Sequence, residues 1–215
     1  MKILYIGNSY IFYNDLPGML QQLCRDNGKD VTIHSVTKGG RRLYRYEDDT
    51  DPVTQSLNEA LKEDYDVCII QEQSLLPVVD PEKFMHGLSV VAGKVRDHVK
   101  KLMLYVTWGR KVGSPNLETL NMTTESMAYA LQDSYQKAAD TYGMTPSPVG
   151  MNFLKVYSEH PEIDLYDPDF SHPSYNGTCL VALTHYKTIF GEIPENTRAL
   201  EISEEFIEIL KGSLQ

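Results

Sequence analysis

Short apolar stretches alternate along this chain with longer segments in which apolar positions recur every three or four residues. The short stretches are rich in β-branched residues, which favour strands, and the longer segments have the spacing of one helical face. Strands are expected at Lys2 to Ile6, Val31 to Val36, Asp66 to Ile70, Leu102 to Thr107 and Thr145 to Val149. Helices are expected at Leu16 to Asn27, Pro52 to Glu63, Pro81 to Lys100, Thr123 to Tyr142, Asn152 to Ser158, Ser174 to Phe190 and Glu204 to Lys211. Such alternation is typical of a parallel sheet covered by helices.

The length and cysteine content fit one globular domain. With 215 residues and no repeat, low-complexity stretch or convincing linker, the chain is expected to form a single domain, 1–215. Its three cysteines are far apart in the sequence and lie among apolar residues. We therefore expect buried thiols in a reducing compartment, rather than disulfides or a zinc site.

Charge and hydropathy argue against two classes of partner. A formal net charge of -10 disfavours general nucleic-acid binding, which needs clustered cations at the phosphates. No apolar run approaches the roughly 18 residues that span a bilayer, and the first residues are strand-like rather than a signal peptide. We therefore expect a cytoplasmic protein without a membrane partner, unless a leader has been removed. The oligomeric state stays open.

Small, amide-bearing and aromatic residues follow the predicted strands. In an open parallel sheet, ligands bind outside the carboxyl ends of the strands. The first four strands are followed in turn by Gly7-Asn8-Ser9, Lys38-Gly39-Gly40, Gln71-Glu72-Gln73-Ser74 and Trp108-Gly109-Arg110. A serine in a small-residue turn after a strand can expose its hydroxyl at the edge of the sheet. Ser9 is therefore a candidate nucleophile.

A candidate base for Ser9 lies near the other end of the chain. His172 could accept the serine proton, and Asp169 can fold back within one helical turn to orient the imidazole. Asp167 is a second acid, but its spacing to His172 fits a helical turn less well. Taken alone, each of these motifs is more often a plain turn or a helix cap. Their combination at the predicted strand ends favours a catalytic triad.

A serine nucleophile also needs donors for the oxyanion of the tetrahedral intermediate. The backbone N–H of Ser9 is one candidate. Gly40 lacks a Cβ and lets a second backbone N–H approach closely, and the amide of Gln73 can offer a third donor. Gln71 points the same way as Gln73 in an extended segment and is the reserve candidate.

These segments resemble the sequence blocks of the SGNH (GDSL-like) hydrolases, in a bacterial subgroup of unassigned substrate. Gly7-Asn8-Ser9 looks like block one, Gly39-Gly40 like block two, and Asp169-Phe170-Ser171-His172 like the Asp-x-x-His of the last block. One departure is that block three usually reads Gly-x-Asn-Asp, whereas Gln71-Glu72-Gln73-Ser74 stands here. The resemblance implies a three-layer α/β/α sandwich with a five-stranded parallel sheet in the flavodoxin-like order 2-1-3-4-5.

The residues and the resemblance together predict a serine esterase that hydrolyses a carboxylic ester through an acyl-enzyme, with no metal or organic cofactor. The resemblance covers carbohydrate acetyl esterases, lipases and thioesterases. Because the chain has no long apolar lid, a short acyl group on a saccharide or similar polar carrier is favoured. Candidate substrate contacts are Asn8, Gln71, Trp108 and Arg41. Trp108 could equally pack in the core, and Arg41 is a candidate solvated loop charge.

Two other functional classes remain open. The first is an SGNH-fold carbohydrate-binding or regulatory module that has lost turnover, which the unusual Gln73 in block three supports. The second is a flavodoxin-like nucleotide binder that uses the turn from Gly7 to Asn14 as a phosphate cradle. The chain lacks both a glycine-rich fingerprint and a P-loop lysine, which disfavours the second class.

Overall fold

The five predicted strands form one parallel sheet. The computed structural model describes residues 1–214. Its strands are β1 (Lys2–Gly7), β2 (Thr32–Thr37), β3 (Tyr65–Ile70), β4 (Val99–Tyr105) and β5 (Thr145–Ser147). They lie in the order β2-β1-β3-β4-β5, and all neighbouring pairs are parallel, which confirms the expected topology. The strand order reverses at β1, the position at which ligands bind in sheets of this kind.

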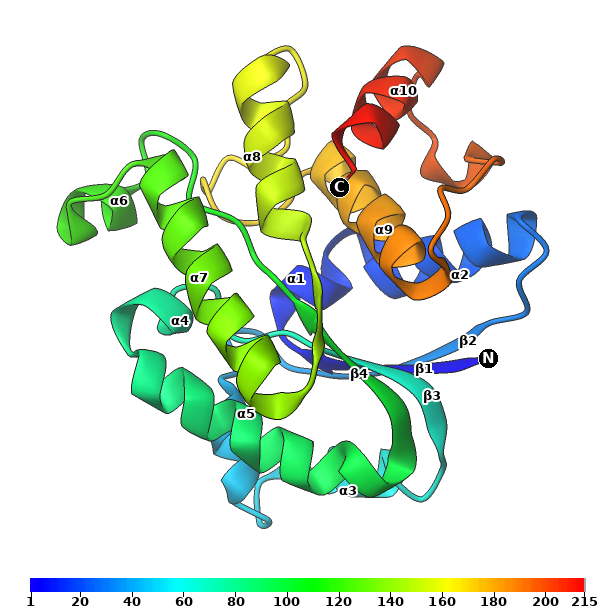
Figure 1. Cartoon of the computed structure of the whole chain (residues 1–215), viewed down its shortest axis with the longest axis vertical. Helices are drawn as coiled ribbons and strands as arrows, with labels where there is room; N and C mark the ends of the chain where they lie inside the picture. The colour runs from blue at the N-terminus through cyan, green and yellow to red at the C-terminus, as the bar shows by residue number, and fades with distance from the viewer. Residues whose placement is uncertain (215) are drawn as a thin grey trace.

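Helices cover both faces of the sheet and produce three layers (Figure 1). The helices are α1 (Ser9–Phe12), α2 (Leu16–Asp26), α3 (Pro52–Ala60), α4 (Leu76–Val79), α5 (Pro81–Val95), α6 (Pro115–Leu120), α7 (Thr124–Tyr142), α8 (Val149–Glu159), α9 (Tyr175–Phe190) and α10 (Glu204–Ser213). Successive strand residues point to opposite faces. Ile3 and Tyr5 of β1 therefore join the core beneath α2 and α9, whereas Leu4 and Ile6 join the core beneath α5 and α7.

The junction between α5 and β4 differs from the sequence prediction. The pattern predicts a helix as far as Lys100 and a strand from Leu102 to Thr107, but α5 ends at Val95 and β4 runs over Val99–Tyr105. The first part of β4 carries charged side chains, so its sequence lacks the apolar pattern of a buried strand. Lys100 forms an ion pair with Asp66 of β3 at 2.7 Å, so this part of the strand lies at the solvent-exposed end of the sheet.

Several shorter elements also differ from the sequence pattern. α4 and α6 have no predicted counterpart because each is too short to show a helical period. No helix or strand is predicted between Arg41 and Asp51, yet this segment contains a 3-10 helix, Leu43–Glu47, that lies against α5. β5 ends at Ser147 instead of Val149, and α8 begins at Val149 instead of Asn152, because Pro148 separates the two elements.

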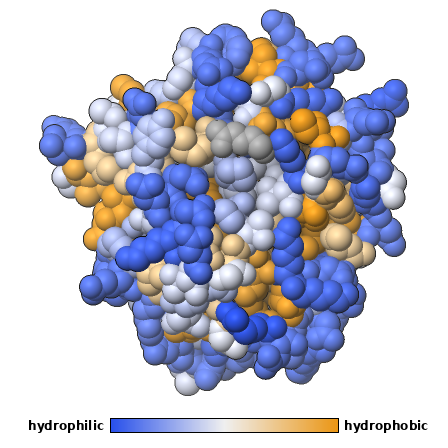
Figure 2. Space-filling view, in the orientation of Figure 1, coloured by the Kyte–Doolittle hydropathy of each residue, from blue (hydrophilic) through white to orange (hydrophobic). Residues whose placement is uncertain are grey.

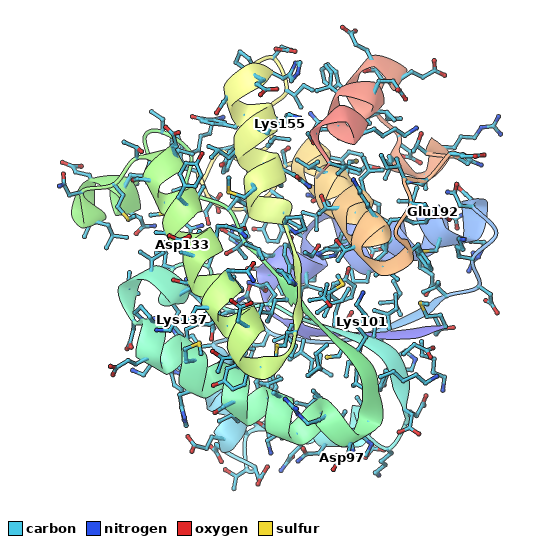
Figure 3. The ribbon with its side chains drawn as sticks, in the orientation of Figure 1. Asp97, Lys101, Asp133, Lys137, Lys155 and Glu192 are labelled. Atoms are coloured by element: carbon cyan, nitrogen blue, oxygen red, sulfur yellow. The ribbon has the colours of Figure 1, made fainter. Side chains whose placement is uncertain are left out.

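Polar side chains dominate the visible face of the molecule, with scattered apolar residues between them (Figure 2). Some of the charged residues tie elements together (Figure 3). Lys155 of α8 donates to the Gly212 carbonyl of α10 at 3.0 Å, and Lys101 of β4 donates to the Thr188 carbonyl of α9 at 3.2 Å. The three cysteines are buried free thiols, as expected. Within residues 1–214, every helix is too short or too polar to cross a membrane.

Candidate active site

Ser9 is the first residue of α1 and directly follows the turn that ends β1. Asn8 caps this helix: its Oδ1 accepts from the Tyr10 N–H at 3.3 Å. The tight turn requires glycine at position 7, because a Cβ on Gly7 would lie 2.7 Å from Gln71 Oε1. As the first helical residue, Ser9 has a backbone N–H without a partner inside the helix.

The structure brings Ser9, His172 and Asp169 into one chain of hydrogen bonds. The Ser9 Oγ lies 2.8 Å from His172 Nε2, and His172 Nδ1 lies 2.5 Å from Asp169 Oδ2. The other carboxylate oxygen accepts the backbone N–H groups of Ser171 and His172 at 3.0 and 2.9 Å. Phe170 has a left-handed backbone, with φ of 63°, which helps the loop fold back on itself.

The Asp169 carboxylate favours one tautomer of the His172 ring. Partial burial alone would raise the pKa of the Asp169 carboxyl, but hydrogen bonds from the ring and from backbone N–H groups outweigh this effect and lower the pKa. An ionised carboxylate accepts the proton on Nδ1, which leaves Nε2 as an acceptor facing the Ser9 hydroxyl. This arrangement can withdraw a proton from Ser9.

Two tyrosines beside Ser9 support the loop that carries His172. The Tyr13 ring stacks on the imidazole, with ring centroids 4.1 Å apart and an interplanar angle of 11°. The Tyr10 hydroxyl donates to the Ser171 carbonyl at 2.9 Å. Neither tyrosine is among the residues expected from the sequence. The spacing of a helix does not indicate Tyr13, because α1 ends at Phe12 and the backbone of Tyr13 is extended.

Trp108, a candidate substrate contact, lies beneath the site rather than in its wall. Its side chain is 1% exposed, and the rings of Tyr10 and Phe153 stack on it at 4.6 and 4.0 Å. Its Nε1 donates to the Ser171 carbonyl at 3.1 Å. The core interpretation of Trp108 therefore agrees with its position, and the indole steadies the loop that carries His172.

The two glutamines after β3 have different environments. Gln71 is fully buried: its Oε1 accepts from the Asn8 N–H at 3.0 Å and its Nε2 donates to the Glu72 carbonyl. Gln73 is half-buried, and its Oε1 accepts from the N–H groups of Leu75 and Leu76 at 3.2 Å. The Gln73 Nε2 makes no hydrogen bond with another group in residues 1–214. Within residues 1–214, Gln73 is therefore the one of the two glutamines whose Nε2 is free to donate to a ligand.

The turn after β2 presents Gly40 to open space. Gly40 has φ of 65°, a conformation that favours glycine, and a Cβ there would meet nothing within 4 Å. Asn8 Nδ2 holds this turn by donating to the Arg41 carbonyl at 3.1 Å. Asn8 is 3% exposed, and both its Oδ1 and its Nδ2 bond to backbone groups of the protein. Asn8 is expected from the sequence as a substrate contact, but its side chain has a structural role.

Arg41 is expected as a substrate contact or a solvated loop charge, but its guanidinium is buried inside the loop. The side chain pairs with Asp51 at 2.9 Å and donates to Thr54 Oγ1 at 3.1 Å and to the Arg45 carbonyl at 3.1 Å. It also lies over the Tyr46 ring, 4.5 Å from the centroid. Arg41 is therefore not a solvated charge, and its contacts stabilise the loop that presents Gly40.

Two buried ionisable side chains flank the segment with Gln73. Glu72 is fully buried and accepts from the backbone N–H groups of Leu43 at 3.1 Å and Gln73 at 2.6 Å. Its burial raises the pKa of the carboxyl to about 8. Arg110 is 4% exposed and donates to Ser74 Oγ at 2.7 Å. Within residues 1–214, no group of His, Cys, Asp or Glu side chains forms a metal-binding cluster.

At the level of sequence, no family model and no curated protein matches the chain. Its structure is similar to a candidate SGNH hydrolase from Slackia heliotrinireducens, with 25% identity and a TM-score of 0.77 over 88% of this chain and 98% of that one. A DUF4886 family protein from Bacteroides uniformis gives 17% identity and a TM-score of 0.84 over 99% and 92%. The acetylxylan esterase Axe2 from Geobacillus stearothermophilus gives 14% identity and a TM-score of 0.63 over 91% and 97%. The chain therefore has the fold of the SGNH hydrolases.

Proposed function

We propose that the protein is an SGNH-type serine esterase that removes an acetyl or another short acyl group from a saccharide or similar polar carrier. The observation that carries this proposal is the hydrogen-bond chain from Ser9 through His172 to Asp169, with distances of 2.8 and 2.5 Å. This chain lies at the carboxyl end of β1, where the strand order reverses. The likeness to an acetylxylan esterase supports the polar carrier.

In the proposed first step, Ser9 Oγ attacks the ester carbonyl carbon while His172 Nε2 takes the hydroxyl proton. The carbonyl oxygen becomes an oxyanion, which accepts hydrogen bonds from the Ser9 and Gly40 N–H groups and from Gln73 Nε2. When the intermediate collapses, the carbon–oxygen bond to the carrier breaks. The leaving alkoxide takes the proton from His172, and the acyl group stays on Ser9.

The second step repeats this chemistry with water. His172 removes a proton from a water molecule, whose oxygen attacks the acyl-enzyme carbonyl. Collapse of the second tetrahedral intermediate returns the proton to Ser9 Oγ and releases the carboxylic acid. Throughout both steps, Asp169 orients the ring and stabilises the imidazolium without taking a proton.

Hydrolysis of 4-nitrophenyl acetate and of acetylated xylo-oligosaccharides by purified variants tests the proposal. We expect Ser9→Ala and His172→Ala each to lower kcat by about 10³-fold or more, and Asp169→Ala by somewhat less. Ser56→Ala, an exposed serine on α3, is the matched control and should keep the wild-type rate. Equal hydrolysis by wild type and Ser9→Ala would contradict the mechanism. An inactive wild type would favour the binding module without turnover.

A further inference from the structure

A hollow lined by cationic residues lies beside the candidate oxyanion glycine. Its volume is about 380 Å³, and its lining residues are Lys38, Gly39, Gly40, Arg41, Arg42 and Arg45. Two hydrogen bonds hold the turn that forms this hollow against the segment preceding Ser9. The Lys38 N–H donates to the Gly7 carbonyl at 3.3 Å, and Asn8 Nδ2 donates to the Arg41 carbonyl at 3.1 Å. The cationic hollow is therefore a neighbour of the proposed nucleophile.

The acidic residues that follow the hollow in sequence are engaged with other partners. Their contacts are Glu47 with His86 at 3.2 Å, Asp48 with Thr50 at 2.7 Å, Asp49 with Lys94 at 2.6 Å and Asp51 with Arg41 at 2.9 Å. In the part of the chain that the structure describes, Lys38, Arg42 and Arg45 form no ion pair. Three cations without an ion-pair partner among residues 1–214 thus lie at one edge of the candidate site of a chain whose net charge is -10, although Arg45 also borders Glu47, Asp48 and Asp51.

Two of these cations lie close to the Tyr44 side chain. The neighbouring guanidinium groups of Arg42 and Arg45 lower the pKa of the Tyr44 hydroxyl. Both arginines are exposed, so their guanidinium groups remain accessible to a ligand. A guanidinium presents a planar set of donors that matches the oxygens of a carboxylate or a phosphate.

We propose that this hollow binds an anionic group on the carrier side of the ester, so that the preferred substrate is an acylated acidic saccharide. The inference rests on the proposed esterase function and specifies its carrier. An anionic group in the hollow would hold the carrier beside Gly40 while the acyl carbonyl lies at Ser9. The same chemistry serves a sugar carboxylate or a sugar phosphate, and matched substrates distinguish these two sources.

The test compares kcat/KM for acetate release within two matched pairs: acetylated glucuronic acid with its uncharged methyl ester, and acetylated glucose 6-phosphate with acetylated glucose. We expect the wild type to prefer the charged member of a pair by roughly tenfold at low salt, the size of one charge-assisted hydrogen bond. The preference should decline as sodium chloride is raised to 0.5 M, because salt screens exposed charges. Whichever charged substrate gives the larger ratio identifies the anion.

The double variant Arg42→Gln/Arg45→Gln should bring the ratio of charged to uncharged substrate close to one. The matched control, Arg25→Gln/Arg198→Gln, removes two exposed arginines elsewhere and should keep the wild-type ratio. A wild-type ratio near one, with hydrolysis that still depends on Ser9, would refute this inference and leave the proposed function intact. No hydrolysis of any ester would refute both. If the double variant does not fold, the salt dependence of the wild-type ratio decides the question.

Discussion

The buried Glu72 carboxyl makes the stability of this protein depend on pH in a predictable direction. Its oxygens accept the backbone N–H groups of Leu43 and Gln73, which lie on the two loops flanking the candidate site. Burial raises the pKa of Glu72 from 4.5 to about 8, although these hydrogen bonds and Arg42 oppose the rise. The native carboxyl therefore holds its proton at pH values where the unfolded chain has lost it.

The size of the effect follows from the change in pKa. Between about pH 4.5 and 8 the native state binds more protons at Glu72 than the unfolded state, so its contribution to stability is lost as the pH rises. At about 1.4 kcal/mol for each pH unit, the loss amounts to at most about 5 kcal/mol across this window. Glu72→Gln removes the titration, because an amide is neutral at every pH in this range.

Urea unfolding of wild type and Glu72→Gln at pH 5, 6, 7 and 8 measures this contribution. We expect the free energy of unfolding of the wild type to fall relative to the variant as the pH rises. The control is Glu118→Gln, an exposed glutamate on α6, which should parallel the wild type. A difference between wild type and Glu72→Gln that stays constant from pH 5 to 8 would refute the reasoning.

Three further expectations concern the site and its supports. Gln73→Ala should lower kcat for acetyl esters by roughly 10²-fold if its amide stabilises the oxyanion, and an unchanged kcat would leave only the backbone donors. Asn8→Ala should lower the free energy of unfolding in urea by about 1–2 kcal/mol, since it removes a helix cap and a buried hydrogen bond; no loss would mean that water replaces both contacts. Burial lowers the pKa of His185 to about 3, so its stabilising contribution is lost as the pH falls from 6.5 toward 3. His185→Gln should therefore move the acid-unfolding midpoint, followed by circular dichroism, to lower pH, and an unchanged midpoint would contradict this.

The sheet, and the proximity of the segments that carry Ser9 and His172, could be predicted because each is marked by a local sequence pattern. β-branched runs mark the strands, and a parallel sheet brings the residues after every strand to one edge. Ser9 and His172 are far apart in the sequence, yet this rule places the first of them at that edge, and the Asp-x-x-His pattern suggested the second. The predicted boundary between α5 and β4 was wrong because Lys100 and Lys101 interrupt the apolar pattern within β4.

The contacts around the candidate site could not be predicted because they depend on which side chains are buried. Arg41 looks like a solvated loop charge in the sequence, but Asp51 and the 3-10 helix enclose it. Trp108 is large enough for a pocket wall, but the stacked rings of Tyr10 and Phe153 cover it. A pattern of residue types carries no information on these packing partners, which are set by tertiary structure.

Covalent labelling with a fluorophosphonate probe, followed by intact and peptide mass spectrometry, tests most directly whether Ser9 is a nucleophile activated by His172. Such a probe reacts with a serine that has a base to deprotonate it. We predict one adduct on Ser9 in the wild type, no adduct in Ser9→Ala and strongly slowed labelling in His172→Ala. A wild type that remains unlabelled, or an adduct that persists in Ser9→Ala, would contradict a catalytic role for this serine.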